Sequence, residues 1–286
     1  MSDASVTTTQ ELQAHLKRLV GDRSLSKPEA LREAQNYITM QLRQANWTVD
    51  QQAFRWMGRQ FDNVVATLPG ESAARLILGA HFDTVKGSPG ADDNASGVAV
   101  LLEAARLLAQ QPLQCTVECV AFNLEEMDMV GSRFHADALK KTTTKILGMY
   151  SLEMVGYTSE APNSQKLPLE LRGRYPSTGN FLSVIGNRRS QGLLQQTMEG
   201  LRAVDGLRAE QLIVPLNGWL LPATRLSDHA PFWDAGYPAL LLTDTAFLRN
   251  PHYHQPTDTL ETLDLEFMAQ VCAGVIAGVQ SVSRKA

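Results

Sequence analysis

Short apolar runs with the character of buried strands alternate along this chain with longer stretches of helical periodicity. The strand-like runs cover residues 47–56, 63–68, 75–80, 116–122, 146–154, 181–185, 211–216 and 239–243. The helix-like stretches cover residues 8–20, 27–45, 98–110, 131–140, 191–203 and 265–282. Such alternation is typical of a sheet whose crossover helices cover both faces. We therefore predict an α/β fold, a three-layer α/β/α sandwich around a mixed, mostly parallel sheet.

The whole chain, residues 1–286, is predicted to form one domain. Its hydrophobic content of 44% suffices for a large core, and no linker, charge block or internal repeat divides it. Residues 156–179 are rich in Pro, Ser, Asn and Arg and have little regular pattern. This stretch is either a lid that shapes a pocket or a long surface loop.

Composition excludes several classes of partner. The formal net charge of -4 gives no basic field for a phosphate backbone, so we expect no nucleic-acid partner. The first ten residues are polar, and we expect neither a signal peptide nor a segment of membrane-spanning length. Cys115, Cys119 and Cys272 are too few for a disulfide framework. These features predict a cytoplasmic protein without a membrane partner.

Histidine and carboxylate side chains gather where the predicted strands end or in the polar loops that follow. They are His81, Asp83, Asp92, Asp93, Glu125, Glu126, Glu153 and His254. The carboxyl ends of parallel strands meet at one edge of an α/β sheet, where active sites form. Zinc takes imidazole nitrogen and carboxylate oxygen, and a pair of zinc ions needs a bridging carboxylate. The pattern predicts a metal-dependent hydrolase in which one further carboxylate takes a proton from metal-bound water.

Several of these residues also have an ordinary structural explanation when they are taken alone. His81 would then be a hydrogen-bonded histidine at a strand end, and Glu125 and Glu126 a solvated turn. Asp92 and Asp93 would belong to a cluster that caps the next helix. Their joint occurrence in one order is what favours the metal site.

The motifs around these residues resemble those of the M28 family of metallopeptidases over most of the chain. They read HFD, GADDNASG, NLEEMDMVGS, SLEM and HYHQPTDT, in the order and spacing of the family pattern. The family includes leucyl-type aminopeptidases and glutamate carboxypeptidases. The resemblance implies a zinc-exopeptidase-like fold and a site for two zinc ions.

Carried over position by position, the resemblance implies five metal ligands. His81 and Glu153 would bind the first ion, whereas Glu126 and His254 would bind the second. Asp93 would bridge the two ions. Many members of the family carry Asp at the position of Glu153, so the first site is the one at which this chain departs from the pattern.

The remaining candidates are implied to support the metal ligands. Glu125 is left as the general base, and Asp83 would accept the ring N–H of a liganding imidazole. His252 lies two residues before His254 and is the alternative ligand, although the HQPTDT context favours His254. Asp228 and His229, in the family-like segment SDHAPFWDAGYP, would position the site or contact substrate, or would only cap the helix that follows.

The predicted function is that of an exopeptidase acting on a peptide or small amide substrate, with an aminopeptidase preferred because cytoplasmic relatives commonly trim N-termini. A carboxypeptidase or dipeptidase is an alternative, in which arginines of the central loops would bind a carboxylate; these are Arg172, Arg174, Arg188 and Arg189. A glutaminyl cyclase with a single zinc ion shares most of the motifs, but such cyclases tend to have Trp where this chain has Tyr253. A non-catalytic relative would be expected to lose ligands or the base, and all are present.

Overall fold

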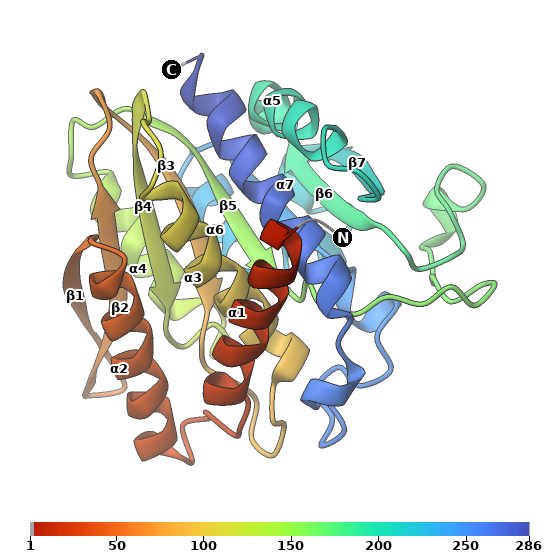
Figure 1. The fold of residues 1–286 in the computed structure, drawn as a ribbon, viewed down its shortest axis with the longest axis horizontal. Coiled ribbons are helices and arrows are strands. Elements are labelled where there is room, and N and C mark those ends of the chain that lie inside the picture. The colour runs from red at the N-terminus through yellow and green to blue at the C-terminus, as the bar shows by residue number, and fades with distance from the viewer. Residues whose placement is uncertain (1–2, 286) are drawn as a thin grey trace.

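The computed structural model describes residues 3–285 and consists of one sheet between two layers of helices (Figure 1). The strands are β1 (Thr48–Trp56), β2 (Arg59–Leu68), β3 (Ser72–His81), β4 (Cys115–Phe122), β5 (Ile146–Glu153), β6 (Leu182–Asn187), β7 (Ala209–Val214) and β8 (Ala239–Thr243). The helices are α1 (Asp3–Leu19), α2 (Pro28–Gln44), α3 (Gly97–Leu108), α4 (Val130–Leu139), α5 (Gln191–Arg202), α6 (His229–Asp234) and α7 (Leu265–Ser283). The predicted α/β/α sandwich is confirmed.

The strands are ordered β1-β2-β4-β3-β5-β8-β6-β7 in an eight-stranded sheet. Four neighbouring pairs are parallel, namely β3 with β4, β3 with β5, β5 with β8 and β6 with β7. The pairs β1 with β2, β2 with β4 and β6 with β8 are antiparallel. Because β4, β3, β5 and β8 run in one direction side by side, their carboxyl ends lie at the same edge of the sheet.

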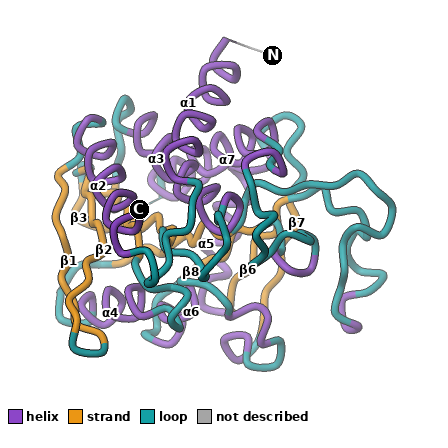
Figure 2. Tube along the Cα trace, turned by 90° about the horizontal axis from the view of Figure 1, so that it is seen from below, coloured by secondary structure: helices purple, strands orange, loops and turns teal. Residues whose placement is uncertain are grey.

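The two faces of the sheet are covered unequally, as Figure 2 shows with α1, α2, α3 and α7 on one side and α4 and α6 on the other. Successive strand residues point to opposite faces. Leu242 of β8 accordingly packs in the core with α3 and α7, and Leu241 packs in the smaller core with α4 and α6. Since α4 has 10 residues and α6 only 6, loops rather than helices cover that face at β6 and β7.

Two element boundaries differ from the prediction for local reasons. β1 and β2 form a hairpin in which Trp56 pairs with Arg59, so β2 begins four residues earlier than expected. Met57 and Gly58 both have positive φ, at 45° and 76°, as a type I′ turn requires. α1 begins at Asp3 instead of residue 8, because a helix whose later turns are packed extends through weaker helix formers such as Ser and Thr.

α7 corrects our expectation that no segment approaches a membrane-spanning length. By length and composition alone it could cross a membrane. It packs against α5, α3 and α1 and buries most of its circumference, and beyond its first residue only a narrow stripe of residues stays partly or fully exposed, namely Glu266, Gln270, Ala273, Ala277 and Gln280. Burial of this extent is expected of a helix at a central position in the core of a large domain.

Candidate metal centre and active site

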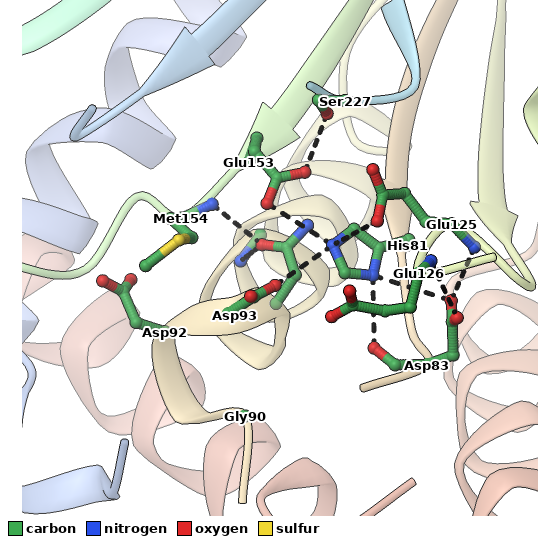
Figure 3. A network of polar contacts seen from close by, with 12 residues as sticks. His81, Asp83, Gly90, Asp92, Asp93, Glu125, Glu126, Glu153, Met154 and Ser227 are labelled. Carbon is green, nitrogen blue, oxygen red and sulfur yellow. Dashed lines mark hydrogen bonds and ion pairs between the residues drawn. The ribbon is translucent and has the colours of Figure 1, made fainter. Parts of the chain in front are cut away.

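Two groups of histidine and carboxylate side chains lie at the carboxyl edge of the sheet and share Asp93. Figure 3 shows the first group, His81, Asp93 and Glu153, with Glu126 of the second group beside it. His81 Nε2 lies 3.3 Å from Asp93 Oδ1 and 3.4 Å from Glu153 Oε1. His254 Nε2 lies 3.1 Å from Asp93 Oδ2 and 3.5 Å from Glu126 Oε2. Within each group the ligand atoms lie within 4.8 Å of one another. The two oxygens of Asp93 therefore face different groups, which is the geometry of a bridging carboxylate.

The sheet topology accounts for this convergence. His81 is the last residue of β3 and Glu153 the last of β5, and these strands are neighbours. Glu126 follows β4 on the other side of β3, whereas His254 follows β8. Asp93 lies in the segment Ala91–Ser96 between β3 and α3. All five proposed ligands thus come from connections at one edge of the sheet, at the point where the chain order reverses.

The acidic groups of this centre perturb one another strongly. Burial raises the pKa of Glu126 to about 9, and the charge of Asp93 adds to the shift. Burial also raises the pKa of Glu125 well above its usual value; the cationic form of His81 opposes this rise, while Glu153 adds to it. Burial disfavours the charged form of His81, but Glu153 and Glu125 outweigh it and raise the pKa of His81 well above its usual value.

The donor set fits divalent metal ions. Imidazole nitrogen and carboxylate oxygen are the ligands that zinc prefers. Asp93, Glu125, Glu126 and Glu153 would carry four negative charges in a largely buried volume, and two divalent ions would neutralise them. Among the described residues, none forms a hydrogen bond with the buried Oε1 of Glu126, so this oxygen is free to bind an ion.

The raised pKa values predict that the metal-free protein loses stability as pH rises. Asp228 and Glu126 keep their protons in the folded state up to pH about 7 and about 9, whereas unfolded carboxyl groups ionise near pH ~4. Between these limits the folded state binds more protons than the unfolded state, so the free energy of unfolding falls with pH. Calorimetry should show the Tm of the metal-free protein dropping by several degrees from pH 5 to pH 9. Zinc should reduce the drop, and a Tm that rises with pH would contradict the prediction.

Glu125 lies beside both groups without belonging to either. Its Oε2 is 4.0 Å from His81 Nε2, and its side chain is 13% exposed and lines the cavity described below. Leu124, the residue before it, has a φ of 61° in the left-handed region, which non-glycine residues adopt at a cost. The turn after β4 therefore places Glu126 among the proposed ligands and Glu125 next to them. Glu125 can exchange protons in that position.

Asp83 contacts both the His81 ring, as predicted, and the turn of Glu125 and Glu126. Its carboxylate accepts hydrogen bonds from the backbone N–H groups of Glu125 and Glu126, at 3.0 and 3.2 Å. The His81 ring nitrogen Nδ1 lies 3.2 Å from the carbonyl oxygen of Asp83 and 3.6 Å from its carboxylate. Both the backbone carbonyl and the carboxylate of Asp83 therefore face the His81 ring, and the carboxylate also holds the Glu125–Glu126 turn, as Figure 3 shows.

The proposed substrate contacts of Asp228 and His229 are not supported by their positions. Both side chains are fully buried and neither lines the cavity. His229 Nε2 pairs with the carbonyl oxygen of Thr224 at 2.8 Å, and Asp228 precedes α6 without a side-chain capping bond. Ser227, which we did not predict, contacts the centre instead by donating a 2.7 Å hydrogen bond to Glu153 Oε2. Its place in the SDHAPF segment was the signal that could have indicated it.

Two further residues support the loop that carries Asp93. The carboxylate of Asp258 accepts the N–H groups of Asp92 and Asp93 at 2.9 and 3.1 Å. The fully buried guanidinium of Arg23 donates to the carbonyl oxygens of Phe82 and Gly90 at 2.8 and 3.0 Å. Asp258 lies in the HYHQPTDT motif and was therefore within reach of sequence reasoning. Nothing in the sequence around Arg23 indicated its contact with this loop.

A cavity of about 270 Å³ opens on the proposed ligands and runs along the sheet face at β8, β6 and β7. Acidic residues and His254 line its metal end, and apolar side chains line most of the remainder. Among the described residues, no lysine or arginine lines it. Of the arginines considered for a carboxylate pocket, Arg172 lines with Lys166 an adjoining cleft on the other side of Gln165, Leu167 and Tyr175, and Arg174, Arg188 and Arg189 line neither.

The residues that flank His254 have distinct positions. Tyr253 lines the cavity, and its ring stacks on the His254 ring with centroids 3.7 Å apart. Burial raises the pKa of Tyr253, and the charge of Asp93 adds to the shift, so its phenol stays protonated as a hydrogen-bond donor. His252 belongs to neither ligand group; its Nδ1 lies 2.9 Å from Thr257 Oγ1. His254 is therefore the histidine that reaches the centre.

Comparisons with known proteins agree with this geometry. A model of peptidase family M28 matches residues 63–279. The chain is 34% identical to YfbL of Escherichia coli (strain K12), itself described as uncharacterized, over 96% of this chain and 87% of that protein. It is 29% identical to leucine aminopeptidase 1 of Ajellomyces dermatitidis over 73% of this chain, and spans only about half (52%) of the length of that relative.

Solved structures of similar fold include enzymes of two activities. LapA aminopeptidase of Legionella pneumophila superposes with a TM-score of 0.75 at 18% identity, covering 98% of this chain and 72% of that one. Glutaminyl cyclase of Porphyromonas gingivalis superposes with a TM-score of 0.70 at 20% identity, covering 97% and 99%. At these identities the likeness supports the fold alone.

Proposed function

The chain belongs to peptidase family M28 and is a metallopeptidase, and from this premise we propose that it is an aminopeptidase with two zinc ions. The observation that carries the proposal is the pair of ligand groups that share Asp93, with Glu125 free beside them. His81 and Glu153 would hold one ion, and Glu126 and His254 the other. Ser227 and Asp83 would keep Glu153 and the Glu125–Glu126 turn in place.

The chain's own residues suffice for the proton transfers of peptide hydrolysis. Bound zinc would acidify a water molecule and polarise the scissile carbonyl group. Glu125 would take the proton of the attacking water and pass it to the leaving amine, because it alone among the central glutamates is not committed to a ligand group. The phenol of Tyr253 would donate a hydrogen bond to the developing oxyanion.

The charge of the cavity supports attack next to a free amino group. Its charged lining residues are acidic apart from His254, and among the described residues no lysine or arginine contributes to it. A carboxypeptidase needs a cationic partner for the substrate's terminal carboxylate. An α-ammonium group would be attracted by the acidic end, so the N-terminal residue would place its side chain in the apolar part.

A glutaminyl cyclase is the second candidate, since one of that activity shares the fold. Glu126 and His254 form a second ligand group with Asp93. The presence of this second group favours a site for two ions over the single zinc ion of such cyclases. Tyr253 in place of Trp agrees with the peptidase. We also propose a cytoplasmic location, because the three cysteines are free and buried.

The test of the function is dependence on a free amine. We expect the zinc-loaded protein to hydrolyse phenylalanyl and leucyl p-nitroanilides, and N-acetylation of the same substrates to reduce kcat/KM at least about 100-fold by removing the ammonium charge. Dipeptides blocked at the C-terminus should remain substrates. Preferential hydrolysis of N-blocked peptides would support the carboxypeptidase instead. Ammonia release from N-terminal glutaminyl peptides, with one zinc per chain, would support the cyclase.

A further inference from the structure

The connection between β5 and β6, residues 156–179, forms a lid on one wall of the cavity. It is the green loop that extends from the body in Figure 1. Its share of the wall consists of Gln165, Leu167, Pro168, Leu171 and Tyr175. Within it the structure has one short 3-10 helix, Leu169–Leu171. The position of the lid, and with it the width of the cavity, therefore depends on individual hydrogen bonds of side chains and backbone groups instead of on regular secondary structure.

One buried side chain, that of Arg249, contacts the lid at both ends. Its Nη1 donates to the carbonyl oxygen of Tyr157 at 3.4 Å, near the start of the lid, and to that of Phe181 at 2.8 Å, just beyond its end. The guanidinium also lies 4.6 Å from the centre of the Phe181 ring. Gly179 approaches so closely that an added Cβ would lie 2.9 Å from atoms of the Arg249 side chain. The two ends of the lid thus converge on one cation.

The middle of the lid is held by the same arginine through Gln165. Arg249 Nε donates to Gln165 Oε1 at 2.9 Å, and Gln165 Nε2 donates to Thr245 Oγ1 at 2.9 Å. Gln165 is 4% exposed although the lid residues around it are mostly exposed. The backbone N–H of Lys166 adds a 2.8 Å bond to the carbonyl oxygen of Leu248. We call Arg249 and Gln165 the lid clasp.

The charge of the clasp is compensated inside the protein. Burial lowers the pKa of Arg249, and the buried carboxylates of Asp244 and Asp92 oppose that shift. A guanidinium with planar N–H donors can hold several acceptors in one fixed arrangement, which a lysine ammonium cannot reproduce. Arg249 lies five residues before His254, so the clasp joins the lid to the segment that carries a proposed metal ligand.

We propose that the lid clasp determines which N-terminal residue the enzyme accepts, by holding the lid wall where a bulky apolar side chain contacts both the lid and the sheet. This inference rests on the proposed aminopeptidase function. A dry cavity of ~150 Å³ accommodates benzene, and the present cavity has about 270 Å³. A phenylalanyl side chain can therefore reach the lid as well as Ile185 and Leu212 on the sheet. The methyl group of alanine buries far less apolar surface and would gain correspondingly less from the lid.

The closing experiment compares bulky with small substrates in Gln165→Leu. The variant leaves Arg249 Nε without its acceptor but keeps a side chain of similar size. We expect kcat/KM for phenylalanyl p-nitroanilide to fall at least about tenfold, mostly through KM, because lid contacts contribute to binding of the side chain. For the alanyl substrate the fall should be markedly smaller, so that the ratio of phenylalanyl to alanyl kcat/KM drops, and bound zinc should be unchanged. Glu170→Gln, an exposed lid residue outside the clasp, is the matched control.

A second variant and a structural readout keep the test independent of activity alone. Arg249→Lys retains the charge without the planar donors, and should change selectivity in the same direction. In both variants trypsin should cut the folded protein faster at Lys166, Arg172 or Arg174 in the lid, since opening of a segment exposes its backbone. The Glu170→Gln control should be cut at the wild-type rate.

The outcomes separate the clasp from the function on which it rests. Wild-type protein without aminopeptidase activity on any substrate would overturn both proposals. An active wild type whose clasp variants keep the wild-type ratio of phenylalanyl to alanyl kcat/KM would overturn the clasp alone. Equal losses on both substrates would also overturn it, because that result would indicate general damage to the metal centre.

Discussion

Glu125→Gln is expected to retain its zinc and its fold while losing about 10³-fold or more of kcat. The substitution keeps the size of the side chain and removes its capacity to accept and return a proton, a role that contributes about 10²- to 10⁴-fold in enzymes. Because Glu125 belongs to neither ligand group, metal binding should not depend on its charge. Steady-state kinetics with zinc analysis of the same sample measures both quantities.

The position of Glu125 makes this result diagnostic. Its neighbour Glu126 is a proposed ligand held by the same turn, so Glu126→Gln is the matched control and should lower zinc content as well as activity. Substantial turnover in purified, zinc-loaded Glu125→Gln would remove this residue from the mechanism. Loss of zinc from the same variant would show that it serves as a ligand instead.

Asp93→Ala is expected to abolish activity, at least about 10⁴-fold, by emptying both metal positions. Asp93 is the only residue common to the two ligand groups found among the described residues, and its oxygens face His81 and His254 separately. Zinc analysis should give two ions per chain for the wild type and a value near zero for Asp93→Ala.

His254→Ala provides the comparison for this prediction. It removes a ligand from one group only, so the group of His81 and Glu153 should keep more metal than in Asp93→Ala. Equal zinc contents in Asp93→Ala and the wild type would contradict the bridging role. Circular dichroism should first establish that each variant is folded, because Asp93 is 4% exposed and lies in the core of the site.

Much of the fold and of the centre followed from local sequence patterns. Apolar runs of strand length separated by helical periods predicted the sandwich, because such runs can be buried only in a sheet that helices cover. The proposed ligands at the ends of β3 and β5 could be located from sequence, because the ends of neighbouring parallel strands necessarily meet. The order of the M28-like motifs then predicted which carboxylate joins the two groups.

What the sequence could not determine depended on contacts between distant segments. The side chain of Asp83 holds the turn of Glu125 and Glu126, 42 and 43 residues away, in addition to facing the imidazole that its spacing from His81 suggested. Ser227 reaches Glu153 and the adjacent Asp228 is buried near the centre without lining the cavity. Neighbouring residues of a turn point in different directions, and only the packing of other segments against the turn selects which one faces the site.

The sequence by itself therefore determined the class of fold, the family and the residues able to bind metal, since these depend on periodicity and on motifs at strand ends. Tertiary structure alone decided the shape and charge of the cavity. Its walls come from β6, β7, β8 and the lid, and the lid is anchored by Arg249 from a segment some 70 residues beyond its end. A local sequence pattern cannot predict such a wall, because the position of each wall residue depends on its contacts with residues of the other segments.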